Sequence, residues 1–328
     1  MNRFTVVVST AAVVAVTAAG VTFAARSGDA SGSPSGGSSN VTGSGTSRSG
    51  AVSFAAGLNG LGEVPEPGGP AADDKNTGDK DGKALAFLRV HGGKVSFALQ
   101  YRGIAAPTAA HVHQGEKGAN GDVAIPLFTK KLADGRTSVS GTVTVKDGQL
   151  LKDLASDPSG FYVNVHTGEF PGGAVRGQLH RLSVPLNMSA ATDSFQASVT
   201  RGSQIYACTR QPGGGYAFTP YNVRAALGGG IAHSFTRPAG SPQWVAPDGS
   251  AVTGEVLAKS PNGTGNIPEL DLRATRSGTA RADGLLADTV EILRLNTVGG
   301  TAPAGTCDPA RQPTISVPYQ ADYLFVGG

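Results

Sequence analysis

Apolar and polar residues alternate in short runs along most of the chain after residue 50. This period of two is typical of β-strands that bury one face, because successive side chains of a strand point to opposite sides. In the first half the runs predict strands at residues 52–58, 84–90, 94–102, 109–113, 122–128, 137–145, 161–166 and 174–182. In the second half they predict strands that include residues 204–208, 251–258, 288–295 and 319–326.

One segment has the spacing of a helix instead. Leu150, Leu151 and Leu154 recur as on one helix face, and Asp157-Pro158 ends the pattern. Elsewhere the 48 glycines and 20 prolines punctuate the strand-like runs and favour tight turns. The sequence therefore predicts an all-β fold with one short helix.

The length of 328 residues indicates two domains rather than one. Residues 51–183 hold eight closely spaced predicted strands, which fit a Greek-key β-barrel or sandwich better than an alternating βαβ order. Residues 184–328 predict a second β-rich, sandwich-like domain.

The N-terminus has the pattern of an export signal. Arg3 is followed by the apolar residues 4–21, and we expect a signal peptide over residues 1–25; an uncleaved membrane anchor is the alternative. Residues 26–50, rich in Ser and Gly, predict a flexible linker. The protein is therefore expected to be secreted or held at the cell envelope. There Cys208 and Cys307, the only cysteines, are expected to form a disulfide.

The charges are evenly distributed. Residues 51–183 carry 14 Lys/Arg against 13 Asp/Glu, and residues 184–328 carry 10 against 10. Without a basic stripe, the sequence argues against nucleic-acid binding. It also holds no G-x-G-x-x-G or phosphate-loop motif, which argues against a nucleotide cofactor. Residues His233, Asp248 and Ser250 lack the nucleophile elbow of a hydrolase, so we expect a turn at Asp248 and a buried Trp244 instead.

Two predicted strands carry a polar face with metal-binding chemistry. His111 and His113 flank Val112 and project from one side of a strand, while Tyr162, Asn164 and His166 share one side of another. Three imidazoles suit copper or zinc, and copper is the first choice. Asn164 or Tyr162 would then fix the tautomer of a ligand by a hydrogen bond. The alternative is that these histidines only bond to loop carbonyls.

Residues 52–183 resemble the CHRD domain, first noted in chordin and found in many secreted bacterial proteins. The resemblance implies an extracellular β-barrel. It is carried by four motifs in order: Ala110-His111-Val112-His113, Gly118-Ala119-Asn120-Gly121-Asp122-Val123, Tyr162-Val163-Asn164-Val165-His166-Thr167 and Pro171-Gly172-Gly173-Ala174-Val175-Arg176-Gly177-Gln178-Leu179.

More distantly, His111-Val112-His113 resembles the copper-ligand pair of copper-zinc superoxide dismutases, and the resemblance implies His166 as a third ligand. No histidine lies between His113 and His166, so the bridging histidine and the zinc loop of those enzymes have no counterpart. The likeness therefore implies metal binding more than dismutase activity.

Residues 186–326 resemble a secreted family catalogued as domain of unknown function 3455. The likeness rests on Gly202-Ser203-Gln204-Ile205-Tyr206-Ala207-Cys208, Trp244-Val245-Ala246-Pro247-Asp248-Gly249-Ser250, residues 295–303, Cys307-Asp308 and Tyr319-Gln320-Ala321-Asp322-Tyr323. It implies no particular activity.

Three hypotheses follow from the sequence. The first is an exported protein that binds copper, or alternatively zinc, at His111, His113 and His166 for metal handling rather than catalysis. The second is an extracellular module that binds a protein or cell-envelope partner without metal. The third is a weak redox enzyme of the dismutase type. None of them involves nucleic acid or membrane insertion beyond the N-terminal segment.

Overall fold

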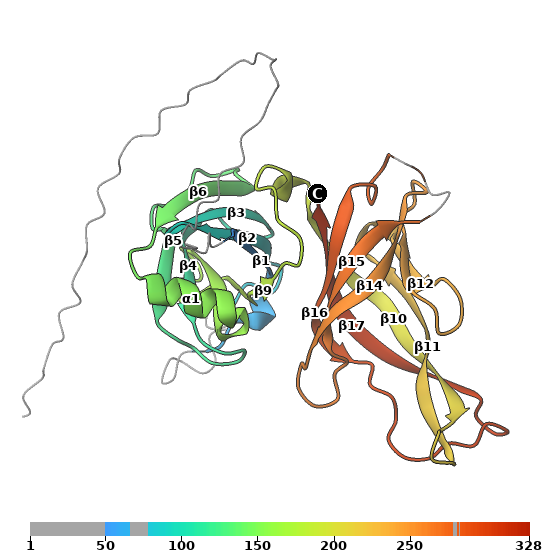
Figure 1. Ribbon diagram of the computed structural model, residues 1–328. Helices are drawn as coiled ribbons and strands as arrows, with labels where there is room; N and C mark the ends of the chain where they lie inside the picture. Colours follow the sequence, from blue (N-terminus) through green and yellow to red (C-terminus); the bar gives the residue numbers. More distant parts are fainter. Residues whose placement is uncertain (1–49, 66–77, 278–280, 282) are drawn as a thin grey trace, which may run out of the picture. The chain divides into compact units, whose positions relative to one another are not determined.

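The computed structural model describes residues 50–65, 78–277, 281 and 283–328 (Figure 1). The predicted signal peptide and all but the last residue of the predicted linker lie outside these residues. Within the described part of the chain, no helix is long and apolar enough to cross a membrane. Two β-domains account for almost all of the structure, which confirms the all-β prediction.

The first domain is one antiparallel sheet that curls into a barrel, with its strands in the order β5-β4-β7-β8-β1-β2-β3-β6 and β9 paired to β1. Neighbours that are distant in sequence, such as β4 with β7 and β8 with β1, give the crossovers expected of a Greek key. Each predicted strand of this half is present, and the last is divided in two. The strands are β1 Val52–Asn59, β2 Lys83–His91, β3 Lys94–Arg102, β4 Pro107–Gln114, β5 Val123–Phe128, β6 Ser138–Thr144, β7 Phe161–Thr167, β8 Val175–Gln178 and β9 His180–Arg181.

Alternation along β4 and β7 divides the core from the polar face. Ala110 and Val112 of β4, with Val163 and Val165 of β7, are almost fully buried in the core of the barrel. Their neighbours in sequence, the histidines among them, point to the other side of the sheet because the side-chain period of a strand is two. A shift of one residue in the register would therefore exchange the core and the candidate site.

The predicted helix is α1, Gly148–Ser156. Asp147 caps it, because its side chain accepts hydrogen bonds from the backbone N–H groups of Gln149 and Leu150. Leu151 and Leu154 are buried against the barrel core. The chain then enters a 3₁₀ turn at Pro158–Gly160 that leads directly into β7. The other 3₁₀ turns are Gly60–Gly62, Ala190–Asp193 and Gly228–Gly230.

The second domain closes into a single barrel in which each strand pairs with the next and β17 returns to β10. The sequence predicted a sandwich-like domain. The closed barrel arises because long strands with β-bulges, such as β10, bend enough to pair with neighbours on both sides along their length. The strands are β10 Phe195–Arg210, β11 Tyr216–Leu227, β12 Ala232–Phe235, β13 Pro242–Val245, β14 Ala251–Ser260, β15 Glu269–Arg276, β16 Thr289–Gly299 and β17 Thr314–Gly327.

A disulfide joins Cys208 on β10 to Cys307 in the segment between β16 and β17, as the sequence predicted. The two Cα atoms are 5.9 Å apart, and the residues are separated by 99 positions in sequence. The backbone N–H of Cys307 also donates to the carbonyl of Tyr216 on β11. The bridge thus attaches the long segment between β16 and β17 to the wall of the barrel.

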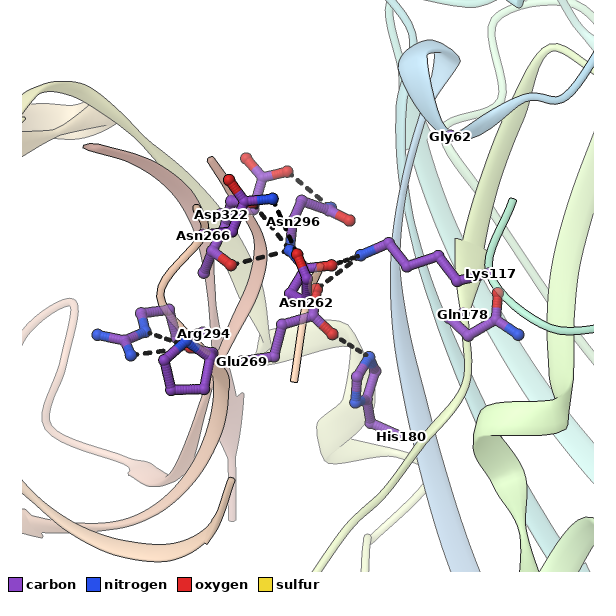
Figure 2. A network of polar contacts seen from close by, with 12 residues as sticks. Gly62, Lys117, Gln178, His180, Asn262, Asn266, Glu269, Arg294, Asn296 and Asp322 are labelled. Atoms are coloured by element: carbon purple, nitrogen blue, oxygen red, sulfur yellow. Dashed lines mark hydrogen bonds and ion pairs between the residues drawn. The ribbon is translucent and has the colours of Figure 1, made fainter. Parts of the chain in front are cut away.

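A polar network surrounds Asn296, a residue of β16 with a left-handed backbone, φ 52° (Figure 2). Its N–H donates to Glu269 Oε1 at 2.8 Å, and its side-chain amide donates to Asp322 at 3.0 Å. Glu269 also pairs with Lys117 Nζ at 2.9 Å and lies 3.6 Å from His180 Nε2. The acceptors of this network are satisfied by donors of the chain itself, which indicates a structural role.

Candidate metal centre

The polar faces of β4 and β7 bring the three predicted ligands together. His111 and His113 are two residues apart on β4, on the face opposite the buried Val112. β7 runs antiparallel to β4 in a register that places Asn164 opposite His111. His166 lies two residues farther along β7 and therefore on the same face.

The imidazoles form a tight cluster, in which one nitrogen of each ring lies within 4.8 Å of those of the other two. The shortest contact joins His111 Nδ1 and His166 Nε2 at 3.1 Å. In a tetrahedral site with metal–nitrogen bonds of about 2.0–2.1 Å, the ligand nitrogens are about 3.3 Å apart. The 3.1 Å between His111 Nδ1 and His166 Nε2 is close to this spacing, and the nitrogen of His113 lies within 4.8 Å of both.

Backbone carbonyls decide which nitrogen of two rings carries the proton. His113 Nδ1 lies 3.0 Å from the oxygen of Gly121, and His166 Nδ1 lies 3.0 Å from the oxygen of Pro171. Because a carbonyl oxygen only accepts hydrogen bonds, each Nδ1 is the protonated nitrogen. Nε2 of each ring then carries the lone pair.

The remaining nitrogens follow from this assignment. His166 Nε2 is unprotonated, so it accepts the hydrogen bond from His111 Nδ1. That donation leaves Nε2 of His111 unprotonated as well. Nε2 of His113 is buried and has no hydrogen-bond partner among the described residues. His113 Nε2 therefore presents a lone pair without any protein donor. The lone pair of His166 Nε2 is occupied by His111 Nδ1–H, and both nitrogens become available to a metal ion when His111 carries its proton on Nε2 instead.

Burial is the main reason that the pKa of each of the three histidines is lowered. The pKa of His111 falls to about 4, with the nearby His166 and His113 as smaller causes. A lowered pKa keeps an imidazole neutral at physiological pH, and the neutral ring is the form that binds metal. The site thus lacks the charge repulsion that protonated histidines would bring.

A stack of three side chains holds His113 in place. The ring of Tyr162 lies parallel to that of His113, with 4.8 Å between centroids and 8° between planes. On Tyr162 lies the guanidinium of Arg176, 3.4 Å from the ring centroid. Sequence reasoning gave Arg176 no role. The structure shows that it is buried and acts through Tyr162 rather than at the ligands.

Arg176 also organises the loop that returns over the site, residues 115–122. Its guanidinium donates to the carbonyls of Glu116 and Ala119 at 3.2 and 2.7 Å and to Asn120 Oδ1 at 3.1 Å. The same loop supplies the Gly121 carbonyl that binds His113. The arginine therefore helps to position a ligand from a distance.

Asn164 and Tyr162 do not bond to the histidine nitrogens, although the sequence suggested that one of them would. Tyr162 Oη accepts from the N–H of Gly121 at 3.2 Å, and Asn164 Nδ2 donates to Glu63 Oε2 at 3.2 Å. The backbone carbonyls take over the role because the loops after β4 and β7 fold back over the rings. The order of side chains in the sequence does not predict which backbone carbonyl a histidine ring will contact.

The remaining candidate residues have structural roles. His233 is buried and stacks on Trp244, with ring centroids 4.4 Å apart and planes 3° apart. Asp248 closes a turn by accepting from the N–H and Oγ of Ser250, at 2.9 and 2.6 Å. The turn and the buried tryptophan were both predicted.

Residues 54–179 match the family model of the CHRD domain, and residues 222–327 match that of a protein of unknown function, DUF3455. Both resemblances found in the sequence are thereby confirmed, in the same order along the chain. The histidine cluster lies within the CHRD match. No curated protein and no solved structure matches the chain.

Proposed function

We propose that this chain is an exported protein whose CHRD domain binds one copper ion, with zinc as the alternative, through His111, His113 and His166. The observation that carries the proposal is the pair of carbonyl contacts that leave Nε2 of His113 and His166 unprotonated. Once His111 carries its proton on Nε2, three neutral rings with nitrogens within 4.8 Å of one another can hold one metal ion. Copper(II) is favoured because it binds nitrogen sites more tightly than zinc does.

The site is proposed for metal handling rather than catalysis. No histidine between residues 113 and 166 is present to bridge a second metal ion. Export is supported by the apolar N-terminal segment 4–21 and by the disulfide, a bond that persists in oxidising compartments.

Elemental analysis tests the proposal directly. Protein recovered outside the cytoplasm, loaded with copper(II) and desalted, is expected to hold about one metal ion per chain. The double variant His111→Ala/His113→Ala is expected to lose that ion, because one imidazole cannot hold it alone. His91→Ala, which removes an exposed histidine beyond the site, is the matched control and should keep full occupancy. An unchanged ratio of metal to protein in the double variant would contradict the proposed metal site. Recovery of the protein only from the cytoplasm would contradict the proposed export.

A glycine in the covering loop offers a second test. A Cβ at Gly121 would lie 1.7 Å from the carbonyl oxygen of Gln114, so Gly121→Ala must displace the loop backbone and its contact with His113. We expect its metal affinity to fall about 10- to 100-fold, the range for loss of a contact that orients a ligand. At Gly168, near His166, a Cβ meets nothing within 4 Å. Gly168→Ala is therefore the matched control, and equal affinities by competition with a chelator would contradict the role of the loop.

A further inference from the structure

Asn164 shares the polar face of the sheet with the three histidines. The strand register places it opposite His111 on β4 and opposite Arg176 on β8. It precedes His166 by two residues on the same face of β7, and its side chain is only 5% exposed. An amide at this position is therefore enclosed by residues of the site.

The orientation of this amide is fixed by its donors. Asn164 Nδ2 lies 3.2 Å from Glu63 Oε2 and 3.5 Å from the carbonyl oxygen of Gly172. The Gly172 carbonyl only accepts, so the nitrogen of the amide faces it. Burial raises the pKa of Glu63 to about 8, and this carboxyl group accepts from Asn164 through Oε2 while its proton resides on Oε1. The oxygen of the amide, Oδ1, is buried and has no hydrogen-bond partner in the part of the chain that the structure describes.

Two more polar atoms, one on the Glu63 side chain that contacts Asn164 and one on His113, also lack a partner. Glu63 Oε1 and His113 Nε2 are buried without a hydrogen-bond partner among the described residues. A buried acceptor without a partner costs free energy, and most such atoms in proteins are satisfied by the chain, by water or by a ligand. Asn164 Oδ1 and His113 Nε2 are orphaned on paired strands that share one polar face, which indicates a place for a metal ion together with a small molecule that donates hydrogen bonds.

We propose that Asn164 Oδ1 accepts a hydrogen bond from a water molecule or a small hydroxyl compound bound to the metal ion at the coordination position that the three histidines leave open. The inference rests on the proposed metal site. Three protein ligands leave a fourth position free at zinc or copper. Because Oδ1 only accepts, Asn164 selects ligands whose coordinating atom carries a hydrogen, and it disfavours anions without one.

Azide titration of the copper(II)-loaded protein tests this selectivity, since bound azide has no hydrogen to donate to Asn164. In Asn164→Leu the bound water loses one hydrogen bond, so we expect azide to bind about three- to tenfold more tightly. In Asn164→Asp a carboxylate accepts from the water more strongly and repels the anion, so azide should bind more weakly by a similar or larger factor.

Tighter azide binding in fully loaded Asn164→Leu is the decisive result, because loss of a merely structural contact would not favour the anion over water, whereas the carboxylate of Asn164→Asp repels azide in any case. Metal content is measured first, so that a lost site is distinguished from a failed inference about its open position. His91→Ala serves as the control and should give the wild-type azide affinity. Fully loaded variants that both bind azide as the wild type does, or that both shift in the same direction, would overturn the proposal. Asn164→Ala removes the same acceptor and replaces Asn164→Leu if that variant fails to fold, and it too should bind azide more tightly than the wild type does.

Discussion

Removal of the Cys208–Cys307 disulfide is expected to lower the free energy of unfolding of the C-terminal barrel by up to about 4 to 5 kcal/mol. In the chain-entropy account, a bridge restricts the unfolded chain in proportion to the logarithm of the loop it closes, and about a hundred residues give this magnitude. Here the two cysteines are 99 positions apart. The double variant Cys208→Ala/Cys307→Ala isolates the effect, because no other cysteine exists to form a wrong pair.

The measurement uses the only tryptophan of the chain as its probe. Trp244 is 1% exposed in the core of the C-terminal barrel, so its fluorescence in a urea titration reports the unfolding of that barrel. The metal content of the variant is the control. It should equal that of the wild type, because the first barrel holds no cysteine. A urea midpoint that does not change on removal of the bridge would contradict the expectation.

The first barrel was predicted strand by strand, whereas only part of the second was. Strands β2 and β3 are continuous nine-residue runs that end in turns with glycine. Their alternation of apolar and polar residues can be recognised from neighbouring positions alone. In contrast, β12 and β13 have only four residues each, which is too short for alternation to be recognised. In β11, Pro220 stands opposite Tyr206 at a register shift, which interrupts the period of two.

The same distinction applies to the candidate metal centre. The sequence predicted His111, His113 and His166, because spacing along a strand determines which side chains share a face. It did not predict the carbonyls of Gly121 and Pro171, since every residue has a carbonyl and only the path of the loop selects one. Local patterns therefore identify the candidate ligands, and tertiary structure identifies the groups that orient their rings.

The C-terminal barrel is also expected to lose stability as the pH falls from about 6.5 towards about 3, because of His233. This ring is 4% exposed, stacks on Trp244 and donates from Nδ1 to the carbonyl of Gln243 at 2.9 Å. Burial lowers the pKa of His233 to about 3, opposed by that hydrogen bond and assisted by the charge of Arg294. In the unfolded chain a histidine has a pKa near 6.5, so between these values the unfolded state binds a proton that the folded state excludes. The stabilisation is complete above about pH 6.5.

Across that window the lost stability amounts to roughly 4 to 5 kcal/mol, at about 1.4 kcal/mol for each unit of pKa difference. The test compares urea midpoints, followed by Trp244 fluorescence, at pH 7.5, 5.5 and 4.5 for the wild type and for His233→Asn. Asparagine keeps an N–H for the Gln243 carbonyl but does not titrate, so the variant should be less stable at pH 7.5 and should lose less on acidification. Carboxylates titrate in both proteins, so their contribution cancels when the pH profiles of the wild type and the variant are subtracted. Asp248 is an example, with its pKa lowered to about 2 by hydrogen bonds with Ser250 and Leu285. Parallel pH profiles for the two proteins would show that the acid sensitivity arises elsewhere.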